Sequence, residues 1–527
     1  MVERRLEVRS EIYRDSITML RVSNELAKLD GVSQAAAVMA TQLNKKLLRD
    51  IGFTGANVDS AKSDDMIIAI EATTKKLLEQ AFSKADELIL AKPSTSSVGN
   101  ALPNTLDAAV SEMENANMVL ISIPGRYAKS ETLNAINKGL NVFLFSSNVS
   151  IEDELELKKR AISSHLLMMG PDCGTSIIND TILGFGNVLR PGPVGIVSAA
   201  STGLQQVSTL LDRQGIGISQ GIGTGGNDLS DEVGGLMMIE GMRLLNDDPQ
   251  TKIIVLISKP PGQKTEERVL EEASKCNKPV VINFLGSGKI ESRIGNNCVA
   301  TRTLEEAAKL ASEKLASNGP WIGGNFDSEE NQKAVAREWN RLAPLQKYIR
   351  GLYSGGTLCY EAQMIMIPFI GEIRSNAPLN KTGRIEGESD ISGHHICIDM
   401  GAEEYVVGRA HPMIDYTLRK LRILKEAKDP ETAVILLDIV LGYGSNPDPS
   451  AELIPAIIQA KKLADDDGRY LSVVASLVGT KNDPQQLDYQ EKRLREAGVL
   501  LLSSNAQAAL AAAQIANRGK KERLIKK

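Results

Sequence analysis

The sequence predicts an α/β protein built from several mostly parallel sheets that are covered by helices. Two observations lead to this class. Short apolar runs bounded by glycine, proline or asparagine alternate along the chain with amphipathic segments of helical period. Hydrophobic residues make up 42% of the 527 residues but aromatic residues only 4%. The cores must therefore consist of aliphatic side chains, which is typical of parallel sheets with helices on both faces. Because one core seldom grows past about 250 to 300 residues, we expect several domains.

The first block, residues 1–92, alternates strand-like and helix-like patterns. Strand patterns lie at 5–9, 32–40 and 66–71, and helical patterns at 16–29, 42–51 and 73–84. This order predicts a small ferredoxin-like α+β block. Serine, proline and glycine then cluster without periodicity at 92–104, which predicts a linker.

The second block, residues 105–189, also alternates strands and helices, but all its apolar runs are short. Strands are expected at 118–123, 141–145 and 166–169, with helices at 127–138 and after Ser150. Ser150 precedes Glu152 and is suited to cap its helix. The pattern predicts a partial Rossmann-like domain, since no first strand and glycine-rich turn are found ahead of residue 105.

The third and fourth blocks, residues 190–318 and 345–518, are interpreted as diverged copies of one flavodoxin-like unit. DDPQTKIIVLI at 247–257 and AKDPETAVILLDI at 427–439 share a helix end, a D-P-x-T turn and a buried strand. Both copies also begin with small polar residues that lead into a helix. The second copy carries an insertion at 367–394, rich in glycine, serine and charge, which we expect to be a functional loop or a partner contact.

Three glycine-rich junctions follow one another between residues 169 and 235: MGPDCGTSIIND, GPVGIVSAASTGLQQ and GIGTGGNDLSDEVGG. The free amides at the start of a helix carry partial positive charge, and small residues let a phosphate approach them. A tight turn explains one such junction equally well, but three in succession, with a fourth candidate at 398–418 in the second copy, favour a phosphate or acyl-phosphate site. The candidate anion-binding residues are Ser201, Thr202, Gly203, Thr224, Gly225, Gly226, Asn227, Ser354, Gly355, Gly356 and Thr357.

If backbone amides bind the anion, we expect Gly225→Val to block its approach without unfolding the chain. Thr202→Ala should weaken binding by about 1 to 3 kcal/mol, the range for one hydrogen bond to a charged group.

The strand-end turn before these helices consists of Asp172, Cys173, Gly174 and Thr175. We interpret it as a structural turn at the edge where ligands of open α/β sheets collect. Cys173 has no histidine near it in sequence, so a buried structural thiol is favoured over a nucleophile.

Arg409 and His411 are the candidate catalytic residues. They stand just ahead of Pro412, which is suited to the first position of a helix. Among only four histidines His411 is the best acid–base candidate, although a structural role in a cap stays open. Arg409, Lys259 and Arg190 are candidate donors to a carbonyl or phosphoryl oxygen.

The motifs as a set resemble two related families. With DDPQTKIIVLISKPPG (247–262) and KPVVINFLGSG (278–288), their order and spacing are similar to the alpha subunit of succinyl-CoA synthetase. With YIRGLYSGGTLCYEAQ (348–363) and LLDIVLGYGSNPDP (436–449), they resemble more closely the FdrA family of acyl-CoA-synthetase-like proteins, over residues 5–517. The resemblance implies a CoA-binding-like Rossmann domain in the second block and synthetase-type flavodoxin-like domains in the third and fourth.

In the synthetases two helices aim their N-termini at a phosphohistidine, and the resemblance suggests such helices after residues 224–228 and after His411. At RIGNNCVAT, where the phosphohistidine would be expected, this chain has Asn296 or Asn297. We therefore expect no phosphohistidine relay. The four blocks also leave no segment for an ATP-grasp fold.

FdrA-type proteins are associated with oxamate carbamoyltransferase, which works with two unrelated companion subunits. The resemblance thus implies a carbamoyltransferase subunit that binds a small acyl or carbamoyl phosphate. An acyl-CoA ligase subunit with a separate ATP-grasp partner, or a non-catalytic regulatory subunit, stays open. Because the first Rossmann turn is missing, we expect CoA to bind weakly or not at all.

The net charge and the cysteine content limit the kinds of partner and the cellular compartment that we expect. The net charge of -5, with one short basic tail at 520–527, indicates no nucleic-acid partner. The chain has five cysteines without a CxxC pair, which favours a reducing compartment and no metal site. Neither a signal peptide nor an apolar run near the ~18 residues of a membrane helix is found. We expect a cytoplasmic oligomer without a membrane partner.

Overall fold

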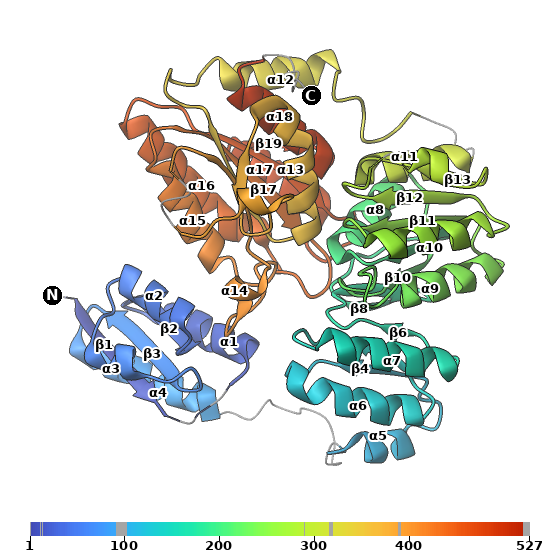
Figure 1. Ribbon diagram of the computed structural model, residues 1–527. Coiled ribbons are helices and arrows are strands. Elements are labelled where there is room, and N and C mark those ends of the chain that lie inside the picture. Colours follow the sequence, from blue (N-terminus) through green and yellow to red (C-terminus); the bar gives the residue numbers. More distant parts are fainter. Residues whose placement is uncertain are drawn as a thin grey trace. The chain divides into compact units, whose positions relative to one another are not determined.

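The computed structural model describes residues 2–10, 12, 14–90, 103–288, 290–315, 320–387 and 392–519, and it confirms the predicted α/β class. The chain forms two compact units (Figure 1). The first comprises Met1–Leu102 and Met400–Leu418, and the second comprises Pro103–Asp399 and Arg419–Lys527. Within the described ranges, no helix combines the length and apolar character that a membrane span requires.

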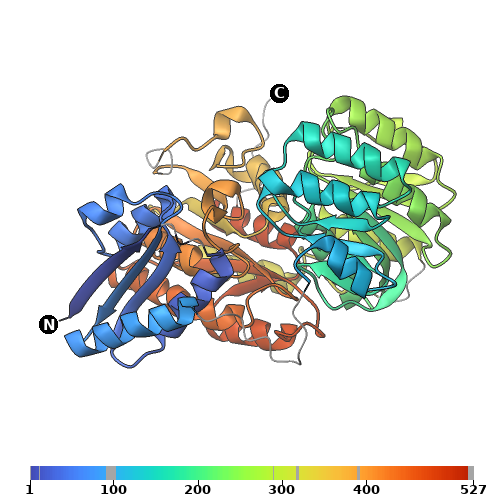
Figure 2. The ribbon, with the colours of Figure 1, turned by 90° about the horizontal axis from the view of Figure 1, so that it is seen from below.

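The first unit contains a three-stranded antiparallel sheet of order β1-β3-β2. Its elements are β1 (Glu3–Arg9), α1 (Ser16–Ala27), β2 (Val32–Met39), α2 (Gln42–Asp50), α3 (Ala56–Ser60), β3 (Met66–Ala72) and α4 (Lys75–Leu90). Alternate residues of β3 point to opposite faces: Ile68 packs with α1 and α4, and Ile67 with α2 and α3. Figure 2 shows this sheet with helices on both faces.

The order of the first unit agrees with the predicted ferredoxin-like block, and α3 is an element that the sequence pattern did not reveal. Among the described residues the sheet has three strands, one fewer than a complete ferredoxin-like sheet. Residues 91–102, most of the predicted linker, lie outside the described part of the chain.

The second unit begins with the Rossmann-like block, a three-stranded parallel sheet of order β4-β5-β6. Its elements are α5 (Leu106–Glu112), β4 (Met118–Ile121), α6 (Gly125–Asn137), β5 (Asn141–Leu144), α7 (Ile151–Ser163) and β6 (Met168–Met169). The predicted cap of α7 is confirmed, because the Ser150 hydroxyl accepts a hydrogen bond from the Asp153 amide at 3.1 Å.

The first flavodoxin-like copy has a sheet of order β13-β12-β11-β9-β10, extended by a hairpin, β7 and β8, at the β10 edge. The elements are β7 (Thr175–Ile178), β8 (Thr181–Gly184), β9 (Pro191–Ser198), α8 (Ser201–Arg213), β10 (Ile218–Gly223), α9 (Leu236–Asp247), β11 (Ile253–Ser258), α10 (Gln263–Ser274), β12 (Val280–Phe284), η1 (Glu291–Arg293), β13 (Cys298–Ala300) and α11 (Leu304–Lys314). The hairpin precedes residue 190, the predicted start of this block, yet it pairs within this sheet.

The second copy follows α12 (Glu329–Trp339) and has a parallel sheet of order β15-β16-β14-β17-β18-β19. Its elements are β14 (Tyr348–Tyr353), α13 (Gly356–Ile370), β15 (Ile373–Ser375), η2 (Lys381–Gly383), β16 (His395–Asp399), α15 (Thr417–Ala427), β17 (Thr432–Val440), α16 (Pro449–Asp466), β18 (Ser472–Val478), α17 (Leu487–Glu496), β19 (Leu500–Leu502) and α18 (Asn505–Ala516). Without the added edge strands both copies have the flavodoxin-like order 2-1-3-4-5. The predicted insertion at 367–394 continues α13 to Ile370 and then adds β15 to the sheet edge; residues 388–391 within it lie outside the described chain.

Between β16 and α15 the chain leaves the second copy, and residues Met400–Leu418, with α14 (Glu403–Val406), belong to the first unit. The side chain of Asn44 donates a hydrogen bond through Nδ2 to the Gly408 carbonyl (3.2 Å) and accepts one at Oδ1 from the Arg409 guanidinium (3.1 Å). Gly408 has φ +71°, and a Cβ there would lie 2.7 Å from Cγ2 of Thr41. The segment Met400–Leu418, which we call the excursion, therefore packs closely against the start of α2.

Candidate functional site

The first helices of the two copies, α8 and α13, meet at their N-termini. A Cβ on Gly355, the residue before α13, would lie 2.8 Å from Cγ2 of Thr202 in α8. A Cβ on Gly203 would lie 3.3 Å from Cγ2 of Thr357. Neither helix has a side-chain cap. Two helix ends with partial positive charge thus converge, and two of the three sequence-predicted anion segments are brought together.

A cation and a carboxylate stand beside the first turn of α13. Lys259 follows β11 of the first copy, and Asp399 ends β16 of the second. A Cβ on Gly356, the first residue of α13, would have Oδ2 of Asp399 at 2.5 Å and Nζ of Lys259 at 3.4 Å. Lys259 is exposed, whereas Asp399 is only 7% exposed. Lys259 is one of the donors predicted from the sequence. Asp399 is not among the predicted residues, because it lies at the end of a buried strand and its sequence neighbours give no sign of a site.

The strand-end turn contributes one further contact to α8. The Gly174 amide donates a hydrogen bond to the Ser201 hydroxyl oxygen at 3.0 Å, so the Ser201 proton stays free to donate. Cys173 is buried, and burial raises the pKa of its thiol to about 11. At neutral pH this buried thiol is therefore protonated, which agrees with the structural role expected for it. Asp172 is exposed, and Thr175 is buried at the start of β7.

A buried ion pair supports the turn before α13. The Asp438 carboxylate in β17 accepts hydrogen bonds from the Ser354 amide (2.7 Å), the Gly355 amide (2.8 Å) and the Ser354 hydroxyl (2.9 Å). Arg419 in α15 lies 2.9 Å from the same carboxylate, and both side chains are fully buried. Ser354 is therefore bound to Asp438, whereas Gly356 and Thr357 make no contact with this carboxylate that would occupy them. The sequence does contain a sign of this ion pair, because Asp438 is the only acidic residue in the largely apolar strand β17.

The third predicted segment, Thr224 to Asn227, is not an open cradle. The Asp228 carboxylate caps α9 by accepting hydrogen bonds from the amides of Met237 (3.1 Å) and Met238 (2.8 Å). The start of this helix, suggested as one of two facing helices, is thus occupied by the chain's own carboxylate. The facing pair is α8 and α13 instead.

A buried lysine fixes the same loop. Nζ of Lys158 in α7 lies 2.6 Å from Glu154, 2.8 Å from Asp228 and 2.9 Å from the Thr224 carbonyl oxygen. The Lys158, Glu154 and Asp228 side chains are almost completely buried. This cluster clamps the Rossmann-like block to the first copy.

Two glycines in this loop differ in their surroundings. Gly225 has φ +87°, and a Cβ there would collide with the Pro171 carbonyl oxygen, whereas Gly226 has open space around it. The expectation that Gly225→Val leaves the fold intact is therefore wrong. Asn227 is exposed next to Gly226.

His411 and Arg409 lie in the excursion, in the other compact unit, so the structure does not unite them with α8 and α13 in one unit. Arg409 forms an ion pair with Asp415 at 2.7 Å. Nδ1 of His411 accepts a hydrogen bond from the Met413 amide at 3.2 Å. The expected helix start at Pro412 is wrong, because Pro412 lies in a turn and α15 begins at Thr417.

Two other predicted residues lie at the amino ends of their strands, away from the junction. Arg190 precedes β9 and bonds to Asp212 at 3.1 Å, so the whole eight-residue strand, about 25 Å long, separates it from Ser201. Arg190 is therefore not a donor at this junction. The Asn297 amide donates hydrogen bonds to the carbonyls of Ala273 and Cys276 and holds the turn before β13. Asn296 lies in the same exposed turn.

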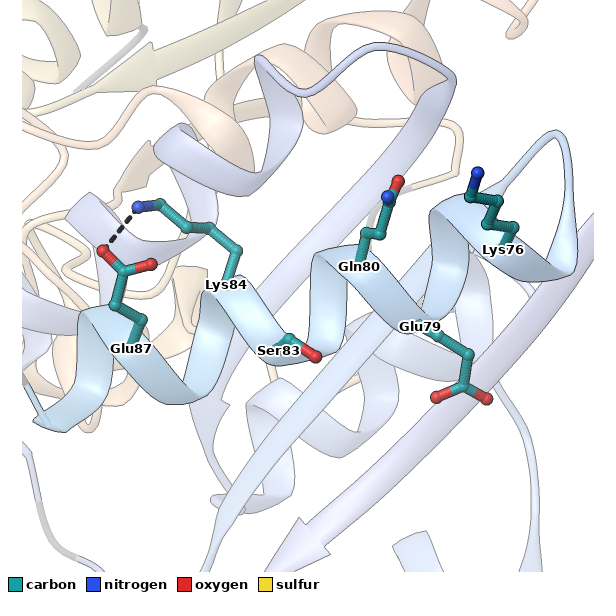
Figure 3. Close-up of a pocket in the computed structure, with 6 residues that line it drawn as sticks. All are labelled: Lys76, Glu79, Gln80, Ser83, Lys84 and Glu87. Carbon is teal, nitrogen blue, oxygen red and sulfur yellow. Dashed lines mark hydrogen bonds and ion pairs between the residues drawn. The ribbon is translucent and has the colours of Figure 1, made fainter.

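A shallow surface depression lies on the outer face of α4, in the first compact unit (Figure 3). Its lining consists of Lys76, Glu79, Gln80, Ser83, Lys84 and Glu87. All six side chains project from one helix, and Lys84 pairs with Glu87 at 2.7 Å. Ligand sites usually combine apolar walls with polar groups from several elements, so this depression is not the candidate site.

Comparisons with known proteins show the family to which this chain belongs. Residues 352–515 match a family model described as CoA-ligase, and residues 1–104 match one described as AllF, heavy metal-associated domain. The uncharacterized protein YahF of Escherichia coli (strain K12) is 40% identical over 516 residues, which cover 98% of this chain and 99% of YahF. The chain belongs to the YahF family.

Part of the chain is also similar to subunits of CoA ligases. Subunit alpha 2 of the ADP-forming succinate–CoA ligase of Archaeoglobus fulgidus is 31% identical over 194 residues, covering 36% of this chain and 66% of that subunit. This confirms the resemblance to succinyl-CoA synthetase alpha subunits. The crystal structure of PH0766 from Pyrococcus horikoshii OT3 covers 76% of this chain and 84% of its own, at 16% identity and a TM-score of 0.31, a likeness too weak to carry an argument.

The heavy metal-associated match does not bring a suitable donor set with it. Residues 1–104 contain no cysteine and no histidine, the side chains that soft metal ions prefer. Within the described ranges, no three His, Cys, Asp or Glu side chains are grouped so as to hold a metal ion. The match therefore concerns the fold of the first unit, and no metal chemistry is assigned to it.

Proposed function

We propose that this YahF-family protein binds an acyl phosphate at the junction of α8 and α13 and takes part in acyl-group transfer without phosphorylation of its own chain. The observation that carries the proposal is the meeting of two uncapped helix N-termini beside Lys259. Such helix ends bind phosphate through backbone amides. A cation at the same place adds a charge-assisted contact.

The proposed chemistry uses these groups directly. The first-turn amides of α8 and α13 hold the phosphoryl group, and Lys259 offsets its negative charge. An attacking nitrogen forms a bond to the acyl carbon, the bond from that carbon to the phosphate oxygen breaks, and phosphate leaves with the bonding electrons. Asp399 accepts the proton that the nitrogen loses. Preorganised amides stabilise the charge that develops in this step, which supplies several kcal/mol without a covalent intermediate.

The FdrA resemblance supports a carbamoyl group as the acyl group, with oxamate as the acceptor and with companion subunits. The order of motifs from residue 5 to residue 517 is in line with this. A subunit role also agrees with the alpha-subunit name of the succinate–CoA ligase relative.

A CoA ligase subunit is the second candidate, favoured by the CoA-ligase match over residues 352–515. Against it stands the short Rossmann-like sheet, in which β4 is an edge strand among the described residues, and the sequence ahead of residue 105 shows no pattern of a first strand with a glycine-rich turn. Calorimetric titration with CoA separates the two: micromolar binding supports the ligase, and weak or absent binding supports the transferase. Purification from the native cell adds a second criterion, since an ATP-grasp partner indicates the ligase.

The test of the proposed site uses two lysines at the two ends of one strand. Lys259 follows β11 and Lys252 precedes it, and both are exposed. We expect Lys259→Gln to weaken binding of phosphate and carbamoyl phosphate by about 1.5 to 3 kcal/mol, the range for a hydrogen bond to a charged group. Lys252→Gln removes the same charge at the far edge and should leave binding unchanged. Equal effects of the two substitutions, or no effect of Lys259→Gln, would contradict the proposed site.

A further inference from the structure

The outer strand of the first unit, β1, has one unpaired edge. Its inner edge pairs with β3 along its whole length, from Glu3 opposite Ala72 to Arg9 opposite Met66. Among the described residues no strand pairs with the other edge (Figures 1 and 2). The amide and carbonyl groups along such an edge are a template for another strand.

Alternate side chains of β1 have different characters. Arg5 and Arg9 lie on the face of α4, where they pair with Glu79 (2.9 Å) and Asp86 (3.0 Å), and Glu7 lies between them. By the two-residue period of a strand, Glu3 shares this face. Leu6 and Val8 lie on the opposite face and pack with the core under α2 and α3. One face of the edge is thus a row of alternating charges, and the other is largely aliphatic.

We propose that β1 pairs antiparallel with β1 of a second copy of this chain, about a two-fold axis at Leu6, so that two three-stranded sheets become one. In this register Arg5 stands opposite Glu7 of the partner subunit, and Glu3 stands opposite Arg9 of the partner subunit. The two-fold axis repeats both pairs. Directly opposite residues in an antiparallel pair share a face and have Cβ atoms about 5 Å apart, so all four pairs are attractive.

Neighbouring registers are disfavoured by the same charges. If the axis moved to Arg5, that arginine would face its own copy and Glu3 would face Glu7 of the partner subunit. If it moved to Glu7, that glutamate would face itself and Arg5 would face Arg9 of the partner subunit. A shift by one residue would put the helices of the two copies on opposite faces of the sheet. The order of charges therefore selects the central register, an isologous interface of the kind found in most homodimers.

The test is a charge reversal with rescue, carried out on the full chain by analytical ultracentrifugation. We expect a dimer for the unmodified protein. Arg5→Glu and Glu7→Arg each place like charges opposite one another twice and should raise the dimer dissociation constant about tenfold or more. The double variant, Arg5→Glu with Glu7→Arg, restores opposite charges and should restore the dimer. Lys76→Glu, on the exposed face of α4, is the matched control and should change nothing.

A second measurement fixes the register. Leu6→Cys places two cysteines at the two-fold axis, at a Cα separation of about 4.5 to 5.5 Å that suits a disulfide. Oxidation should link two chains through this position, and Arg4→Cys should link far less. A monomeric unmodified protein would overturn the proposal. So would a dimer that persists in both single charge variants, since the edge would then be covered by the chain's own segment or the dimer would use another surface.

Discussion

Glu361 gives this protein a dependence of stability on pH whose sign and size follow from its position. It lies in α13 at 1% exposure, where its carboxylate accepts hydrogen bonds from the Leu304 amide and from the Asn505 side chain, both at 2.7 Å. It thereby joins α13 to the first turns of α11 and α18. Burial raises the pKa of Glu361 to about 7, and the charges of Glu305 and Glu306 act in the same direction, while its hydrogen bonds act against it.

The raised pKa favours the protonated carboxyl in the folded chain. In the unfolded chain this group has a pKa of about 4.3, so between about pH 4.3 and pH 7 the folded state holds a proton that the unfolded state lacks. The free energy of unfolding must therefore fall as the pH rises through this window. The slope is at most about 1.4 kcal/mol per pH unit, which gives an upper limit of about 3 to 4 kcal/mol for the whole window.

Glu361→Gln removes this titration, and urea unfolding at several pH values from about 5 to about 8 measures the result. We expect the unmodified protein to lose stability relative to the variant as the pH rises, and to lose no more once the pH exceeds the folded pKa. Glu313→Gln, the same change at an exposed position of α11, should leave the pH dependence as it was. If the difference between unmodified protein and Glu361→Gln is constant across the range, the reasoning is refuted.

Three further predictions concern the clamp, the glycine loop and the chain's own phosphorylation. Lys158→Met should destabilise the protein by about 3 to 5 kcal/mol in urea unfolding, because two carboxylates stay buried without their cation, and a loss similar to that of the exposed control Lys159→Met would contradict this. Gly225→Val should lower the melting temperature far more than Gly226→Val, because only the first position has positive φ and a carbonyl in the way. Incubation with labelled ATP or carbamoyl phosphate should leave no acid-labile phosphohistidine, and stable label on any histidine would count against a direct transfer.

The sequence was informative wherever structure depends on neighbours along the chain. The cap at Ser150 is a local hydrogen bond, and the two D-P-x-T turns, at 248–251 and 429–432, join a helix end to a buried strand in each copy. The glycine-containing segments at the starts of α8 and α13 were likewise predicted together, because each places small polar residues before a helix. What the pattern did not reveal is that Gly355 packs on Thr202, because that contact joins residues far apart in the sequence.

The site residues that were predicted wrongly share one physical cause. The residues adjacent to a charged group in the sequence do not show which distant group it binds in the fold. Glycines before α9 look like an anion cradle, yet the Asp228 carboxylate already occupies the amides there. Arg409 looks like a free donor, yet it bonds to Asn44, which is 365 positions away, and to Asp415. Arg190 precedes the amino end of β9, whereas the junction lies beyond its carboxyl end, and the position of the strand in the fold is needed to see this.

Because α8 and α13 belong to one polypeptide, their junction forms without an encounter between separate molecules. The effective concentration of one helix near the other is fixed by the chain, so dilution does not take the junction apart. A pair of identical copies related by two-fold symmetry would present the same side chains on both sides. Here the first copy supplies Lys259 and the second supplies Asp399, and both charged groups reach the same first turn of α13. A molecule bound there as proposed would therefore meet two different side chains, and only one of its two orientations would place its negative end at the lysine.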